Sequence, residues 1–320
     1  MTAGTPAVDL VEERSGRYLL DRAGVLGPLL LLPTVVYIVA LVGVPLVLAL
    51  LFSLSDVTVG DQSLDFVGLR NFRDAIDNAT FRQALRNTFL FTVVSQALVL
   101  VLANILALVL SVDFKGKRLV RFLILLPWTT PIALGALGWL WTLDNVFSPI
   151  DYVLRQVGLL GIGSPLGQRW EGTNALWLAQ PDLARLTVLT IHVWRTLPLA
   201  TVILLAGLAA IPQDIKDAAN VDGAGFFRQL FSIRIPLLLP IMAVAVLYGI
   251  VFTFTDMTVV FIVTRGGPID STQVLASWAY FKGIEGGSLG QGAAIALFLF
   301  PVLVGVAAMM LRLARRTETV

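Results

Sequence analysis

Residues 211–240 read IPQDIKDAANVDGAGFFRQLFSIRIPLLLP, and this stretch separates two long apolar segments. Pro212 is a favourable first residue for a helix, and residues 213–221 contain strong helix formers. Gly223 and Gly225 then end that helix and allow the chain to turn. A second short helix would have an apolar face formed by Phe226, Phe227, Leu230 and Phe231. Pro236 and Pro240 would limit it. The pattern predicts a short helix, a glycine turn and a return into an apolar medium.

Small side chains in this loop would let the surface of another protein approach the backbone closely. They are Ala218, Ala219, Gly223 and Ala224. An alternative interpretation is an amphipathic loop that lies on a membrane surface, which is common in membrane proteins. The composition of the loop favours neither interpretation over the other.

The composition of the whole chain indicates a membrane protein. Of its 320 residues 57% are hydrophobic and 14% are charged, with a mean hydropathy of +0.85, whereas soluble domains have about 45–50% apolar and about 25% charged residues. The net charge of +2 provides no basic field for nucleic acid. The chain has no cysteine and a single histidine, His192. This excludes disulfides, thiol catalysis and metal centres built from cysteine or several histidines.

Six long stretches are free or nearly free of charged residues, and each can hold the roughly 20 residues that a membrane-spanning helix needs. They are residues 23–55, 88–112, 122–143, 186–213, 235–264 and 286–311. We expect an all-α integral membrane protein, because a helix satisfies its own backbone hydrogen bonds in lipid. The expected organisation is a tail at 1–22, a six-helix domain at 23–311 and a second tail at 312–320.

The distribution of Lys and Arg predicts the orientation of these helices. Basic residues are about twice as dense in the two tails and in the second and fourth connections as in the other connections. We therefore expect both termini on the cytoplasmic side. A cleaved signal peptide is not expected, because the first 22 residues are polar and partly acidic, and the first apolar segment is too long.

Two of the apolar segments contain polar side chains in pairs. His192 and Arg195 lie in the fourth segment, and Thr253 and Asp256 lie in the fifth. Each pair has the i,i+3 spacing that places both members on one helix face. Polar groups inside a membrane are costly and usually face the protein interior or a water-filled path. They could line a passage for a solute; alternatively Arg195 and Asp256 could pair with each other, and His192 could be a packing residue.

The loop at 211–237 resembles the EAA motif of the permease subunits of ABC importers. That motif runs E-A-A, three residues, G, and about nine residues to I-x-L-P. The chain matches it with Asp217-Ala218-Ala219, Gly223 and Ile233-Arg234-Ile235-Pro236, followed by Leu239-Pro240. Asp217 keeps the charge of the usual glutamate but has a shorter reach.

Two other stretches resemble the carbohydrate branch of this family, the relatives of the maltose permease subunits. TRGGP at 264–268 is similar to the T-x-G-G-P segment after the fifth span. LLPW at 125–128, with Pro131, is similar to the L-P-x-x-x-P entry to the third span. The ordered set is more specific than any single motif, and it covers most of residues 85–310.

The resemblance implies the type I ABC importer permease fold, with six transmembrane helices and a cytoplasmic coupling helix, in a bacterial cytoplasmic membrane. The implied partners are a second, paralogous permease subunit, two ATP-binding subunits, an extracytoplasmic solute-binding protein and membrane lipid. The residues that it assigns to coupling with the ATPase are Asp217, Ala218, Ala219, Asp222, Gly223 and Ala224. Those that it assigns to a carbohydrate, expected to be a di- or oligosaccharide, are Trp128, His192, Arg195, Gly249, Thr253 and Asp256.

No cofactor is expected on this chain, and no enzymatic activity. The sequence lacks G-x-x-x-x-G-K-[ST], the loop that holds nucleotide phosphates, so ATP and Mg would be bound by the partner subunits. Arg195 leaves open an anionic sugar- or glycerol-phosphate derivative as the solute, because Arg binds phosphate bidentately. An ion-coupled secondary transporter is a further alternative, but such folds usually show repeats. An intramembrane enzyme would show motifs such as H-E-x-x-H or G-x-S-x-G, which the sequence lacks.

Overall fold

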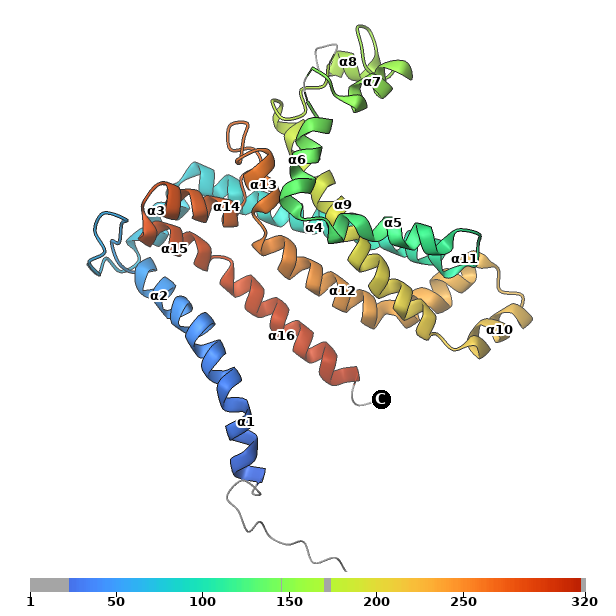
Figure 1. The fold of residues 1–320 in the computed structure, drawn as a ribbon, viewed down its shortest axis with the longest axis horizontal. Helices are drawn as coiled ribbons and strands as arrows, with labels where there is room; N and C mark the ends of the chain where they lie inside the picture. The colour runs from blue at the N-terminus through green and yellow to red at the C-terminus, as the bar shows by residue number, and fades with distance from the viewer. Residues whose placement is uncertain (1–22, 145, 170–173, 318–320) are drawn as a thin grey trace, which may run out of the picture. The chain divides into compact units, whose positions relative to one another are not determined.

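The computed structural model describes residues 23–144, 146–169 and 174–317. In that part of the chain the regular structure is helical, and strand-like pairing is limited to one isolated bridge between Ser55 and Phe66. The elements, in chain order (Figure 1), are α1 (Ala23–Ile38), the π-helix η2 (Val39–Gly43), α2 (Val44–Ser53), α3 (Arg70–Asp77), α4 (Ala79–Ser111), α5 (Lys117–Thr129), α6 (Ile132–Thr142), α7 (Pro149–Gln156), α8 (Pro165–Arg169), α9 (Pro181–Ala210), α10 (Gln213–Val221), α11 (Phe226–Gln229), the π-helix η3 (Leu230–Arg234), α12 (Ile235–Thr255), α13 (Thr258–Val263), α14 (Leu275–Tyr280), the π-helix η4 (Phe281–Glu285), α15 (Leu289–Leu297) and α16 (Phe300–Thr317).

The chain divides into two compact units, residues 1–51 and 52–320. In the first unit α1, η2 and α2 follow one another without a break and form one apolar helix. The π-turn η2 ends two residues before Pro45. Proline has no backbone N–H and its ring clashes with the carbonyl four residues earlier, which explains why the helix adjusts its hydrogen bonding at this place.

The second unit is built around three long helices. α4 packs along α9, and α12 contacts both of them. Ala103 and Ala107 of α4 are fully buried against Leu204 of α9 and Leu238 of α12. A Cβ atom at Gly207 would lie 2.8 Å from side-chain atoms of Leu238 and Ile241, so side chains of α12 pack directly onto α9 at this glycine. Small residues thus let the three helices approach closely in the absence of a hydrophobic driving force in lipid.

Five helical segments are long and apolar enough to cross a membrane. They are Leu26–Ser53, Ala79–Ser111, Pro181–Ala210, Phe226–Thr255 and Leu289–Arg312. The expected third span, 122–143, is not one straight helix: it consists of α5 and α6, which meet at an angle of 98°. Pro131 has no N–H to donate, and it forces Thr130 into an extended conformation (φ −72°, ψ 130°). The helix therefore breaks between α5 and α6. The pair counts as a sixth span only if the bent segment crosses as a whole.

The expected fifth span, 235–264, is also interrupted. α12 ends at Thr255, and the extended Asp256 leads into the short helix α13. The side chain of Asp256 accepts a hydrogen bond from the backbone N–H of Thr258 (2.9 Å), so it caps the start of α13. The apolar stretch expected at 235–264 therefore consists of two helices, and the membrane-spanning helix itself ends at Thr255.

The long helices define two ends of the second unit. The ends of α4 and α9 and the start of α12 lie at one end, together with α10 and the start of α5 (Figure 1). α3, α13, α14 and α15 lie at the other end. A separate small core lies around α7, where Leu160, Ala175 and Trp177 pack with Leu143 and Leu183.

The buried Asp151 of α7 accepts hydrogen bonds from the indole N–H of Trp177 (2.8 Å) and the backbone N–H of Ala175 (2.9 Å).

Candidate functional site

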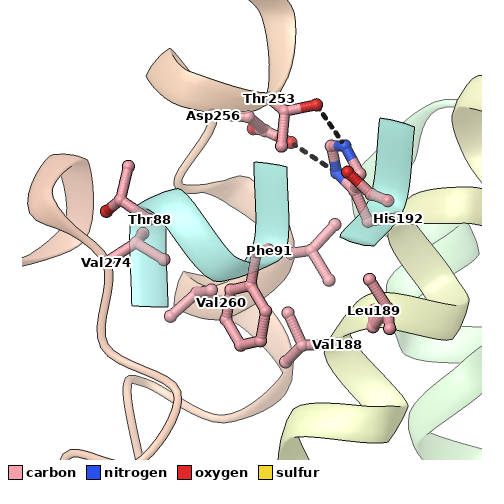
Figure 2. A pocket seen from close by; sticks show the side chains of 11 residues that line it. Thr88, Phe91, Val188, Leu189, His192, Thr253, Asp256, Val260 and Val274 are labelled. Atoms are coloured by element: carbon pink, nitrogen blue, oxygen red, sulfur yellow. Dashed lines mark hydrogen bonds and ion pairs between the residues drawn. The ribbon is translucent and has the colours of Figure 1, made fainter. Parts of the chain in front are cut away.

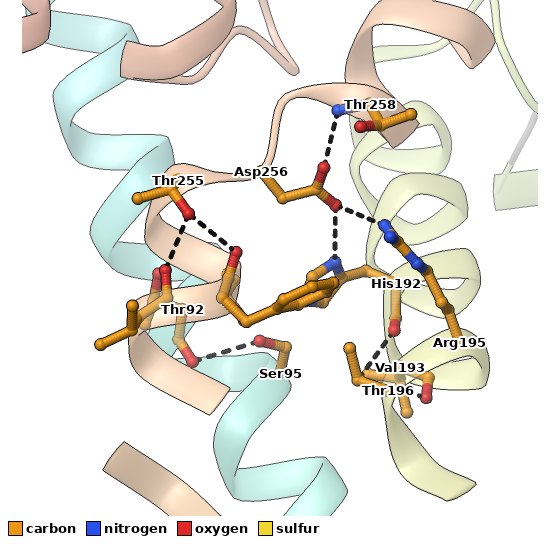
Figure 3. A network of polar contacts seen from close by, with 12 residues as sticks. Thr92, Ser95, His192, Val193, Arg195, Thr196, Thr255, Asp256 and Thr258 are labelled. Carbon is orange, nitrogen blue, oxygen red and sulfur yellow. Dashed lines mark hydrogen bonds and ion pairs between the residues drawn. The ribbon is translucent and has the colours of Figure 1, made fainter. Parts of the chain in front are cut away.

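The two polar pairs predicted from the sequence meet between α9 and α12 (Figure 3). Arg195 Nη1 donates to Asp256 Oδ2 at 2.9 Å, and the two side chains are 17% and 10% exposed. His192 Nε2 lies 2.9 Å from Thr253 Oγ1, and its Nδ1 lies 3.8 Å from Asp256 Oδ2. The alternative of a direct Arg195–Asp256 pair is therefore what this structure contains. Asp256 combines two tasks, because its other oxygen caps α13.

A fifth polar side chain, Gln96 of α4, joins this network. Its Nε2 donates to Thr253 Oγ1 at 3.0 Å, so that Thr253 lies between Gln96 and His192. Sequence reasoning missed Gln96. The same criterion that selected His192 and Arg195, a polar residue within an apolar segment, applies to residues 88–112 and would have selected it.

Gly249 belongs to the same place for a steric reason. A Cβ atom at Gly249 would lie 2.0 Å from Gln96 Oε1, so only glycine leaves room for the Gln96 amide against α12. The sequence motif placed Gly249 in the site, and the structure assigns it contact with a side chain of this chain.

We expect Gly249→Ala to displace Gln96 and to break its hydrogen bond with Thr253. Thr253 keeps its contact with His192, but the buried Gln96 amide loses its partner, which costs about 1–3 kcal/mol. The melting temperature of the detergent-solubilised protein should therefore fall. The matched control is Gly138→Ala in α6, where a Cβ atom meets nothing within 4 Å. An equal melting temperature for the two variants would contradict the assigned role of Gly249.

Aromatic side chains adjoin the polar network on the side of α5. The ring of Phe252 lies beneath the Arg195 guanidinium, with 4.8 Å between Cζ and the ring centroid. The centroid of Trp128 is 5.9 Å and that of Tyr248 is 6.1 Å from the centroid of Phe252. Trp128 is thus brought to the predicted site, and Phe252 and Tyr248 are aromatic neighbours that the sequence did not single out.

Two small cavities border the network. One of about 30 Å³ lies beside His192, Thr253 and Asp256, and it is lined elsewhere by apolar side chains such as Phe91 and Val260 (Figure 2). The other, of about 20 Å³, lies between Gln96, Trp128 and Phe252. A water molecule needs roughly 10–15 Å³ of such volume, so each cavity can hold about one or two waters and neither can hold a sugar ring.

A second polar cluster fixes the TRGGP loop to the helices. Asn87 of α4 donates to the carbonyls of Ser271 (2.8 Å) and Gln273 (2.9 Å), and Arg185 of α9 donates to the Ser271 carbonyl (3.0 Å). Gly266 has φ +89°, and a Cβ atom there would lie 2.4 Å from Gln273 Oε1. The glycine in this motif is therefore required by both its backbone conformation and the close approach of Gln273.

The predicted coupling loop is present as a helix, a glycine turn and a second short helix. α10 spans Gln213–Val221, and Gly223 has φ +68° with open space around its Cα. Gln229 Nε2 closes the turn by donating to the Ala224 carbonyl at 2.8 Å. Asp217 is exposed and accepts a hydrogen bond from Gln213 of the same helix (3.0 Å).

The remaining residues assigned to coupling differ in their surroundings. Ala218 and Asp222 are exposed, as is Val221 at the end of α10, whereas Ala219 is only 6% exposed. Ala219 therefore packs against this chain itself. The face of α10 that is open to another protein carries Asp217, Ala218 and Val221.

Long apolar helices around a buried polar network are the features of a multi-pass membrane protein. Residues 99–319 match the family described as "Binding-protein-dependent transport system inner membrane component", and the chain belongs to this family. The resemblance to the permease subunits of ABC importers is thereby confirmed.

Relatives of the chain match it over most of their length. It is 30% identical over 295 residues to the trehalose/maltose transport system permease protein MalF of Thermococcus litoralis, with 92% of this chain and 95% of that protein covered. It is 27% identical over 307 residues to the diacetylchitobiose uptake system permease protein DasB of Streptomyces coelicolor (93% and 89% covered). It is also 27% identical over 255 residues to the sn-glycerol-3-phosphate transport system permease protein UgpA of Agrobacterium fabrum (79% and 82% covered).

The fold is similar to that of a chain in the crystal structure of a bacterial ABC transporter involved in the import of the acidic polysaccharide alginate. The TM-score is 0.76 with 18% identity, and 94% of this chain and 97% of that chain are covered. This similarity confirms the expected type I permease fold for the chain, a multi-pass membrane protein.

Proposed function

We propose that this chain is one membrane-spanning subunit of an ATP-driven importer. The importer would take a carbohydrate, a di- or oligosaccharide, from an extracytoplasmic binding protein and pass it across the cytoplasmic membrane by alternating access. The observation that carries this proposal is the exposed helix α10 with its left-handed turn at Gly223, within a chain of the binding-protein-dependent family.

The exposed face of α10 supports its role as the coupling helix. An exposed carboxylate, a small side chain and an apolar side chain lie at Asp217, Ala218 and Val221. Asp217 would provide a charge-assisted contact to the ATP-binding subunit. The turn and the Gln229 bond would keep α10 rigid enough to transmit a movement to α9 and α12.

A carbohydrate is supported by the chemistry of the buried network and by the relatives. Trp128, Tyr248 and Phe252 offer aromatic faces, and His192, Thr253 and Gln96 offer hydrogen-bond partners for hydroxyl groups. Transport systems named for trehalose and maltose and for diacetylchitobiose are among the relatives. Because the two cavities beside the network are too small for a sugar ring, the solute would bind after the helices separate, in a space shared with the second permease subunit.

An anionic solute such as a glycerol phosphate is the second candidate, supported by the relative named for sn-glycerol-3-phosphate. Arg195 is the cation that would bind its phosphate. In this structure, however, Asp256 neutralises Arg195 at 2.9 Å. The neutral pair favours an uncharged carbohydrate.

We also propose which proteins this chain assembles with and how it is oriented in the membrane. The second permease subunit would be a paralogue, and two ATP-binding subunits would hold ATP and Mg at the α10 end. Both termini would then be cytoplasmic, which agrees with the distribution of Lys and Arg. The opposite end, with the TRGGP loop, would face the binding protein.

The test is purification of the tagged chain from its native membrane, followed by ATPase assays in proteoliposomes with the co-purified binding protein. Maltose, trehalose, diacetylchitobiose and sn-glycerol-3-phosphate are the solutes to compare. We expect an ATP-binding subunit and a second permease to co-purify, and a neutral sugar to stimulate hydrolysis. Stimulation by sn-glycerol-3-phosphate alone would select the second candidate. A chain that transports without any ATP-binding subunit would refute the importer mechanism.

A further inference from the structure

The segment 112–121, which comprises the connection between α4 and α5 and the start of α5, concentrates positive charge at the α10 end of the second unit (Figure 1). Its four basic residues are Lys115, Lys117, Arg118 and Arg121, against the single acid Asp113. These residues contribute to the charge distribution that indicates the orientation of the helices, and they take no part in the network around Arg195.

Two of the four basic side chains hold the connection against α4. Lys117 Nζ donates to Asp113 Oδ1 at 2.9 Å and to the Ser111 carbonyl at 3.3 Å. Arg121 Nη2 donates to the Leu110 carbonyl at 3.1 Å. The hydrogen bonds to Ser111 and Leu110 satisfy backbone carbonyls at the C-terminal end of α4 that have no partner within the helix. The hydrogen bond and the charge of Lys117 lower the pKa of Asp113, so this carboxylate stays ionised and is already paired.

The other two basic side chains have no such partner. Lys115 and Arg118 are exposed and make no hydrogen bond or ion pair within the described residues. Beside Arg118 lies an open depression of about 610 Å³, bordered by Asp113, Phe114, Gly116, Lys117, Arg118, Leu119 and Arg121. Lys115 lies between two of these residues in the chain, Phe114 and Gly116. The charge around the depression is therefore available to an anion from outside the chain.

Apolar side chains flank the same depression. Phe114 and Leu119 are 38% and 61% exposed, and Phe122 and Leu123 continue the exposed apolar surface along α5. Basic side chains beside an apolar surface that continues into a membrane-spanning segment are typical of the boundary between lipid head groups and acyl chains. A soluble anion would use the charges but would leave the apolar flank in water.

We propose that this depression binds the phosphodiester head group of an anionic phospholipid, with Arg118 at its border and the neighbouring exposed Lys115 as the charge contacts, and Phe114 and Leu119 beside the upper acyl chains. With the orientation given under the proposed function, on which this point rests, the bound lipid belongs to the cytoplasmic leaflet. Binding itself does not depend on transport, so the two proposals can fail separately.

The test is a titration of the full-length chain, in neutral detergent micelles, with dioleoylphosphatidylglycerol and with dioleoylphosphatidylcholine, followed by native mass spectrometry. We expect retention of the anionic lipid and not of the zwitterionic one. Each basic residue near an anionic surface contributes about fivefold in affinity, so Lys115→Gln/Arg118→Gln should bind the anionic lipid roughly twentyfold more weakly. Arg118→Lys keeps the charge and should retain most of the binding.

The matched control is Arg73→Gln/Arg86→Gln. These two basic residues, in α3 and near the start of α4, are exposed and unpaired, and they lie at the end of the second unit that is opposite to the depression. It should bind the anionic lipid as the unchanged chain does. Equal weakening in both double variants would show an effect of net charge alone and would overturn the proposal. Displacement of the lipid by millimolar inorganic phosphate would also overturn it, in favour of a site for soluble anions. Loss of lipid binding on assembly with the ATP-binding subunit would assign the surface to that protein instead.

Discussion

Gly223→Val is expected to abolish uptake while the protein remains in the membrane. Gly223 has φ +68° at the turn that follows α10. A β-branched residue in this left-handed region costs roughly 1–3 kcal/mol, and a change of the turn that relieves this strain alters the orientation of α10 relative to α11 and α12. Because α10 is the proposed contact with the ATP-binding subunit, we expect uptake of the transported sugar to fall roughly tenfold or more, measured in cells with equal membrane levels of the protein.

Gly225→Val is the matched control for this prediction. Gly225 lies two residues further along the same turn, also with open space around it, but its backbone is extended (φ −66°, ψ 167°). Valine adopts that conformation without strain. Normal uptake by Gly223→Val, or an equal loss in both variants, would refute the view that the left-handed turn orients the coupling helix.

The second large effect is expected at the buried ion pair between Arg195 and Asp256. Removing one partner leaves an unpaired charge in a poorly solvated place, which costs about 3–5 kcal/mol. Arg195→Met and Asp256→Asn should therefore each lower the melting temperature strongly. Asn keeps an oxygen that can cap α13 at Thr258, so the Asp256→Asn result reports mainly on the charge. The double variant has no unpaired charge, and it should recover most of the lost stability.

Transport by the double variant separates the two interpretations of this pair. If the pair also lines the solute path, the double variant is stable but imports sugar poorly. Recovery of both stability and transport would show that the pair is only structural. The exposed pair between Arg70 and Asp56 is the matched control, and the equivalent double substitution there should change stability by less than about 1 kcal/mol.

Much of the fold could be predicted from the sequence because its signals are local. Long uncharged segments predict helices whose backbone must be satisfied within the segment, and glycine at 223 predicts a turn that other residues adopt only with strain. The breaks within segments were missed. Pro131 in an apolar run and Asp256 after Thr255 both end helices, but hydropathy averages over such single residues.

The candidate site was predicted in part. Spacing placed His192 with Arg195 and Thr253 with Asp256 on their own helices. Hydropathy and spacing did not show that the two faces meet, nor that Gln96 joins them from a third helix.

The sequence by itself determined that this is a helical membrane protein with an exposed helix–turn segment, because periodicity, charge and glycine act over a few residues. Only the tertiary structure decided which polar groups neutralise one another. Arg195 is paired with Asp256 rather than free for an anion, Gly249 makes room for Gln96, and Lys115 and Arg118 stay open while Lys117 and Arg121 do not. The physical reason is that pairing depends on distances of a few ångströms between residues far apart in the chain, which the packing of α4, α9 and α12 sets.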